Sequence, residues 1–207
     1  MTAIISDEAR RTAPLALWRY AHEYLRAARS LSREISVRCS ESQAPYHVAA
    51  QGIEFALKAF LRAHGATMAE LRDDVGHSLL AALTRSEALG LPAMPRRCRA
   101  AIADVAPCHQ NEQFVYMVTP LKAFPDIDPL VDAGAWILDR IAPDVVEQFV
   151  QHRAGDASPA APELLQRLRA DLSATSDIVN PQPSAAGVAA RDRGAAPQGA
   201  AGRSRRR

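Results

Sequence analysis

The stretch that decides the fold is residues 51–61, Gln51-Gly52-Ile53-Glu54-Phe55-Ala56-Leu57-Lys58-Ala59-Phe60-Leu61. Its apolar residues recur at the three- and four-residue spacing of one helix face, and its polar residues form a second stripe at the same spacing. The apolar stripe consists of Ile53, Ala56, Leu57, Phe60 and Leu61, and the polar stripe of Gln51, Glu54 and Lys58. The pattern therefore predicts an amphipathic helix, in which Glu54 and Lys58 form an i,i+4 pair in the favourable order.

The same helical period continues outward on both sides of this stretch. It predicts helices over residues 14–37, over 45–64, from after Gly76 to Gly90, over 96–105, and from 128 onward. Pro14 and Pro45 suit the first turns of their helices, and Gly65 suits the residue after a helix end.

The fifth helix has the clearest start signal. Asp128 can cap it, Pro129 fits its first position, and Pro143 is predicted to kink or restart it. Residues 107–128, which contain three prolines, are predicted to be an irregular crossing segment. The best strand candidate, residues 114–118, is short and isolated. These features predict an all-α helical bundle of about five helices.

The length of 207 residues accommodates one domain of roughly 150 residues and a tail. We predict an N-terminal arm over 1–13, the bundle over 14–152, and a disordered tail rich in Ala, Pro and Arg over 153–207. Within the tail, four leucines share one helical face, which indicates either a transient helix or an element that docks on the bundle: Leu164, Leu165, Leu168 and Leu172.

The net charge of +2 is unevenly distributed. Residues 191–207 carry six Arg and one Asp, and residues 153–190 carry three Arg and four acidic residues, which leaves a net charge of −2 on residues 1–152. The bundle therefore lacks the net basic character of a typical duplex-binding domain, whereas the terminal Arg cluster could contact a polyanion or simply stay solvated.

Three cysteines, Cys39, Cys98 and Cys108, have no paired spacing, and Cys108-His109 has no partner at zinc spacing. We therefore expect free thiols, no metal site and no cofactor. The sequence begins without the charged and apolar regions of a signal peptide, and no apolar run approaches the roughly 20 residues that span a bilayer. We expect a cytoplasmic protein without a membrane partner.

The chain resembles a known family through three motifs and the order in which they follow one another in the sequence. They are Tyr20-Ala21-x-x-Tyr24-Leu25-x-x-Ala28, the 51–61 block, and Gly76-His77-Ser78-Leu79-Leu80. This order and spacing resemble the HEPN domain, a helical bundle of many prokaryotic proteins, best over residues 15–91. The resemblance implies two long antiparallel helices at the base of the bundle and a homodimer.

The resemblance also implies two functions. The favoured hypothesis is a binding or interaction module of unknown ligand, without catalysis. The alternative is a metal-independent ribonuclease of the toxin type, restrained by a nucleotidyltransferase or other antitoxin partner. Active family members carry an Arg followed after four to six residues by His, and Arg72 and His77 have this spacing. Asp73 and Asp74 would compete for the Arg72 guanidinium, and His77 could instead close a helix junction through a hydrogen bond.

Three further groups of polar residues are candidate sites. Gln51, Glu54 and Lys58, together with His77, could line a seam that binds a nucleotide-like or small polar ligand, or they could form a solvated or internally paired helix face. Residues 109–112 (His-Gln-Asn-Glu) could form a binding loop or a surface crossover. Three arginines at the start of the fourth helix could contact phosphate or stay solvated: Arg96, Arg97 and Arg99.

Overall fold

The computed structural model describes residues 12–38, 42–114 and 126–154. These residues form an all-α helical bundle without a strand, as the sequence predicts. Its elements are α2 (Pro14–Arg38), α3 (Ala44–Ala63), α4 (Met68–Glu70), the π-helical turn η1 (Leu71–Val75), α5 (Leu79–Ala88), α6 (Arg96–Gln110) and α7 (Asp128–Ala154). Residues 153 and 154, assigned to the tail by the sequence, end α7, and the predicted Leu164–Leu172 element lies outside the described residues.

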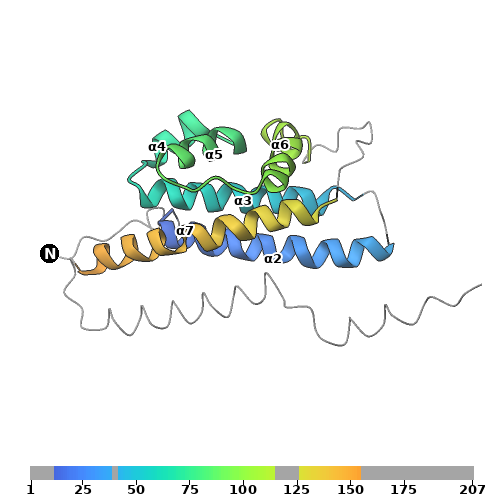
Figure 1. Ribbon diagram of the computed structural model, residues 1–207, viewed down its shortest axis with the longest axis horizontal. Helices are drawn as coiled ribbons and strands as arrows, with labels where there is room; N and C mark the ends of the chain where they lie inside the picture. The colour runs from blue at the N-terminus through green and yellow to red at the C-terminus, as the bar shows by residue number, and fades with distance from the viewer. Residues whose placement is uncertain (1–11, 39–41, 115–125, 155–207) are drawn as a thin grey trace, which may run out of the picture.

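The helices form two layers (Figure 1). The three long helices α2, α3 and α7 lie side by side, with α2 antiparallel to α3 as expected and α7 in contact with both. The second layer consists of α4, η1, α5 and α6, and it covers the side of α3 that faces away from α2. As a result, α3 is the central helix of the bundle, and residues on its upper side face α5 and α6.

The long helices meet at Leu25, whose side chain is almost fully buried. Gly52 of α3 and Gly134 of α7 lie against it so closely that a Cβ on Gly52 would be 2.9 Å from Leu25 Cγ, and one on Gly134 would be 2.7 Å from Leu25 Cδ1. The two glycines therefore provide the room in which α2 packs against both neighbours.

Trp18 joins α2 to α7 by a polar contact. Its indole Nε1 donates a hydrogen bond of 3.3 Å to the backbone carbonyl of Leu138, although the two residues are 120 positions apart in the sequence. The ring is buried, so the contact also satisfies a donor that burial would otherwise leave unpaired.

Glycines end α3 and α5 as predicted. At the end of α3, Gly65 has a positive φ of 90°, and the N–H groups of Gly65 and Ala66 donate to the carbonyls of Arg62 and Leu61. Gly90, with φ of 105°, ends α5 by the same pair of bonds. This is the Schellman arrangement, which satisfies the last carbonyls of a helix.

The predicted end of the fourth helix at Val105 was wrong. Helix α6 continues through Pro107 to Gln110, and Cys108 and His109 of this last part are buried. A proline inside a helix removes one backbone hydrogen bond and crowds the preceding turn, but the burial of two side chains beyond it outweighs this cost. Residues 107–110 are therefore helical, and not part of an irregular crossing segment.

Helix α7 also differs from the prediction. Asp128 is its first residue rather than its cap, since the carboxylate of Asp126 accepts the Asp128 N–H at 3.2 Å. The helix runs on through Pro143 without a restart. Between α3 and α5, where the sequence analysis predicts no helix, the chain forms α4 and η1. Thr67 and Glu70 start α4 with a reciprocal capping box.

Candidate functional site

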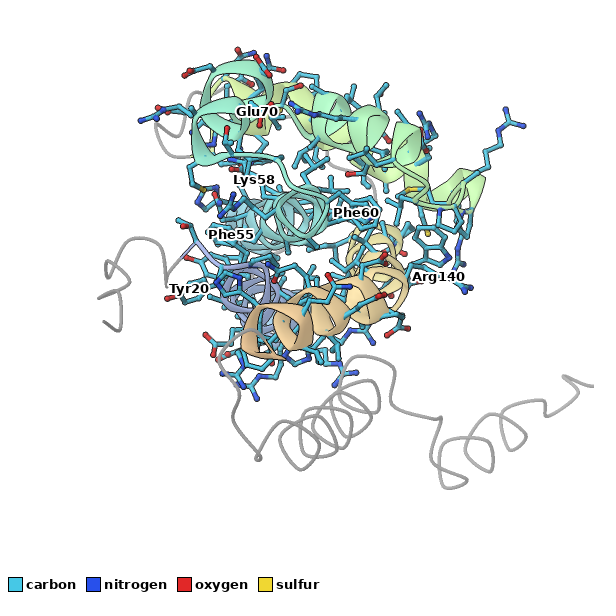
Figure 2. The ribbon with its side chains drawn as sticks, turned by 90° about the vertical axis from the view of Figure 1, so that its left-hand side faces the viewer. Tyr20, Phe55, Lys58, Phe60, Glu70 and Arg140 are labelled. Carbon is cyan, nitrogen blue, oxygen red and sulfur yellow. The ribbon has the colours of Figure 1, made fainter. Side chains whose placement is uncertain are left out.

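One side of α3 carries a polar stripe formed by His47, Gln51, Glu54 and Lys58, spaced four, three and four residues apart. This spacing places them on the same side of the helix. Figure 2 shows Lys58 on the part of α3 nearer the layer that contains Glu70, whereas Phe55 lies near Tyr20 of α2. The polar stripe therefore lies between the two layers.

Glu54 is the centre of the stripe, and only 3% of its side chain is exposed. Its Oε1 accepts a hydrogen bond of 2.6 Å from Lys58 Nζ, one turn further along α3. Its Oε2 lies 3.1 Å from His77 Nδ1 and 2.6 Å from His109 Nε2. We call these four residues, Glu54, Lys58, His77 and His109, the Glu54 cluster.

His77 reaches the cluster from the turn between η1 and α5. Leu71 and Val75 of η1 are buried, and the N–H of Gly76 donates to the Leu71 carbonyl at 2.9 Å, which ends the π-helical turn. Ser78 then caps α5, because its hydroxyl accepts the N–H of Ala81. His77 is held between these two fixed ends, yet 56% of its side chain is exposed.

His109 reaches the cluster from the last turn of α6, the part of the helix that lies beyond Pro107. Its side chain is buried, and its ring lies edge-on to His77 with the ring centroids 6.2 Å apart. The ring centroid of His47 is 6.4 Å from that of His109. Three segments distant in the sequence thus converge on one carboxylate.

The environment of Glu54 strongly favours its ionised form. Burial by itself raises the pKa of Glu54, but the hydrogen bond from His109, the charge and hydrogen bond of Lys58 and the hydrogen bond from His77 outweigh it and lower the pKa to about 2. Glu54 is therefore a carboxylate throughout the physiological range.

His47 borders the cluster, and its surroundings favour the neutral form of its imidazole. Burial, followed by the charge of His109, lowers the pKa of His47. Its Nδ1 is buried and has no hydrogen-bond partner within the described part of the chain. The ring packs against that of Phe114, with the centroids 5.9 Å apart.

The residues predicted from the sequence are distributed as follows. Glu54, Lys58 and His77 come together in the Glu54 cluster. Gln51 is half-buried on the same stripe of α3, but it takes no part in the hydrogen bonds of the cluster among the described residues. Arg72 points to solvent, with 75% of its side chain exposed and its Nε 3.6 Å from Asp73 Oδ1. The structure thus brings His77, but not Arg72, to the buried carboxylate.

The other candidates have separate surroundings. His109, predicted to lie in a loop, belongs to the cluster through α6. Arg97 pairs with Asp132 at 2.8 Å and Arg99 pairs with Glu87, so acidic neighbours already engage two of the three clustered arginines. Cys98 and Cys108 are buried and form no disulfide within the described residues, and Cys39 lies outside these residues.

The donor atoms of Glu54, His77 and His109 all lie within 4.8 Å of one another. Sequence spacing could not indicate this group, because its members come from α3, the turn after η1 and α6. A carboxylate and two imidazoles in this arrangement can hold a proton, a polar ligand or a metal ion.

The comparisons with known proteins give no further assignment, because no protein-family model, curated protein or solved structure matches the chain. None of the described helices has both the length and the apolar character that are needed to cross a bilayer.

Proposed function

We propose that this chain is a HEPN-like binding module, without catalysis of its own, whose ligand is recognised at the Glu54 cluster. The observation that supports this most is the position of Glu54: a buried carboxylate with three basic partners, one of which, His77, is more than half exposed. The hydrogen bond between Glu54 and His77 therefore links the buried carboxylate to a side chain that solvent and ligands can reach.

Stability alone is a weak reason for such a cluster. Removing two charges from water costs several kcal/mol for each ion, and well-packed apolar residues in their place often give equal or greater stability. Glu54 and Lys58 are both largely buried, and the two histidines add further polar groups to the same place. Clusters of buried polar groups that carry such a desolvation cost are typical of functional sites.

The exposed edge of His77 is where a ligand would make contact. Its Nδ1 faces Glu54, which leaves Nε2 for a polar or anionic group. The expected ligand is nucleotide-like or another small polar molecule, in agreement with the seam predicted from the sequence.

One observation favours the second candidate, a metal-independent ribonuclease that uses Arg72 and His77. A carboxylate that accepts a hydrogen bond from Nδ1 fixes the orientation and tautomer of an imidazole, and this prepares Nε2 to take a proton from a 2′-hydroxyl. In this function Arg72 would leave Asp73 to stabilise the phosphate charge.

One experiment separates the two candidates. The purified full chain is titrated with ATP, GTP and a short single-stranded RNA, and RNA integrity is followed in parallel. Binding that is lost in His77→Ala and retained in His152→Ala, an exposed histidine of α7, supports the binding module. RNA cleavage that disappears in both Arg72→Ala and His77→Ala supports the ribonuclease. If none of the three probes binds and RNA stays intact, the proposed nucleotide-like ligand is wrong.

The partners that the resemblance implies belong to the same proposal. We expect a homodimer, and a nucleotidyltransferase or other antitoxin as the partner of the ribonuclease alternative. Light scattering at high micromolar protein tests the first: a monomer mass contradicts it.

A further inference from the structure

We propose that the Glu54 cluster binds a divalent transition-metal ion, with Zn²⁺ as the best fit, through Glu54 Oε2, His77 Nδ1 and His109 Nε2. This inference rests on the proposed function in one respect only, namely that the same cluster is the ligand site. It adds a metal ion at this site to the nucleotide-like or other small polar ligand of the proposed function.

The types of donor favour such an ion. Two imidazole nitrogens and one carboxylate oxygen are a common set of three protein ligands for zinc, with a fourth position left for water or another ligand. Imidazole also suits Cu²⁺, Ni²⁺ and Fe²⁺, whereas Mg²⁺ and Ca²⁺ prefer sites made of oxygen atoms.

The geometry is close to what a metal requires. The three donor atoms lie within 4.8 Å of one another, and both nitrogens already face the same oxygen, at 3.1 and 2.6 Å. Tetrahedral bonds of about 2.0–2.1 Å place ligand atoms about 3.3 Å apart, so the two hydrogen bonds must widen by less than about 1 Å. The backbone of His77 is held in its turn, but more than half of its side chain is exposed, which leaves the imidazole room to rotate.

Lys58 lies on the far side of the carboxylate. It contacts Oε1, whereas both histidines contact Oε2, so an ion bound at Oε2 has the carboxylate between itself and the ammonium group. A hydrogen bond to the second oxygen of a ligating carboxylate also holds that carboxylate in a one-oxygen binding mode. Lys58 is therefore a positioning residue, and not a ligand.

Access to the ion comes from the side of His77. Glu54 and His109 are buried, so the exposed imidazole marks the edge of the cluster that meets solvent. A fourth ligand, either water or a donor atom of a small molecule, would enter here.

The test uses the purified full chain after dialysis against a chelator. Zn²⁺ is titrated by calorimetry, and Co²⁺ is added separately because its visible spectrum reports the ligands. We expect one ion per chain, a higher thermal midpoint with Zn²⁺, and a Co²⁺ spectrum with four-coordinate bands and no thiolate charge-transfer band. His77→Ala should weaken binding about tenfold or more, Glu54→Gln should do the same, and His152→Ala should leave it unchanged.

His77→Ala is the decisive variant, since His77 is exposed and its loss should leave the fold intact, which circular dichroism checks. If Zn²⁺ does not bind, if His77→Ala binds as tightly as the original chain, or if Co²⁺ shows a thiolate band, the inference is overturned. If the chain does not bind Zn²⁺ but does bind nucleotide or RNA through His77, this inference is wrong and the proposed function is still supported.

Discussion

His109 Nε2 lies 2.6 Å from Glu54 Oε2, and neither side chain is accessible to solvent to any important degree. The two residues are 55 positions apart, on the central helix of the lower layer and on the last turn of α6. This hydrogen bond therefore connects the two layers of the bundle through a pair of buried polar side chains.

Replacing Glu54 by Ala should destabilise the fold severely. The change leaves Lys58 and His109 without their shared acceptor, and breaking a buried pair by removing one partner costs about 3–5 kcal/mol. Denaturant unfolding at neutral pH measures the loss. Glu23→Ala, at an exposed position of α2, is the matched control and should change stability by less than about 0.5 kcal/mol. Equal effects of the two substitutions would contradict the role given to Glu54.

The stability of the chain should fall steeply in acid, and Glu54 should account for part of the fall. The folded-state pKa of about 2 lies below the ordinary value of 4.5, so the ionised carboxylate stabilises the fold above pH 4.5, and this contribution is lost as the pH falls towards 2. Between about pH 5 and about pH 3 the loss amounts to about 2 kcal/mol.

The measurement compares the original chain with Glu54→Gln in EDTA, by denaturant unfolding at these two pH values. Because Gln does not titrate, the stability difference between the two proteins should shrink by this amount at the lower pH. A difference that is independent of pH would show that Glu54 is not held in its charged form.

Gly134→Ala should destabilise the bundle although alanine is the better helix former. The new Cβ would collide with Leu25, whose side chain is almost fully buried and also lies close to Gly52, so it has little room to move away. Overpacking of this kind costs about 1–3 kcal/mol, whereas the helix propensity of alanine alone would add about 1 kcal/mol of stability. The sign of the change in unfolding free energy thus decides between the two effects. Combining Gly134→Ala with Leu25→Val should recover part of the loss.

Glu112→Gly should stabilise the end of α6. Glu112 has a positive φ of 54°, and its N–H and that of Gln113 donate to the carbonyls of His109 and Cys108, which is the Schellman arrangement with a glutamate in the position that glycine prefers. Glycine adopts this conformation without strain, so we expect a gain of about 0.5–1 kcal/mol in unfolding free energy. Glu112→Ala, which keeps a Cβ, should give no such gain.

The sequence predicts the long helices well because their signals are local. The apolar stripe around Ile53 and Leu57, and the glycines that end α3 and α5, act within a few residues, and the structure has them as expected. The i,i+4 pair of Glu54 and Lys58 is local in the same sense.

The site itself depends on contacts that no local pattern contains. Pro107 indicates a helix end, and only the burial of Cys108 and His109 against the other helices carries α6 past it. The sequence therefore predicts a loop or a surface crossover at His109, with no link to Glu54. Likewise, Arg72 and His77 have a suggestive spacing, but the structure turns Arg72 to solvent and His77 towards Glu54.

The hydrogen bond from Trp18 to the Leu138 carbonyl has a practical consequence for spectroscopy. The chain contains two tryptophans, and Trp136→Phe would leave Trp18 as the single tryptophan, whose emission can be excited selectively over that of the tyrosines. Its emission would then depend on whether α7 is seated on α2, since separation of the two helices exposes the indole to water. The fluorescence of Trp18 would thus report the detachment of α7 from α2 in real time. Loss of helix content in the rest of the molecule would be followed separately by circular dichroism.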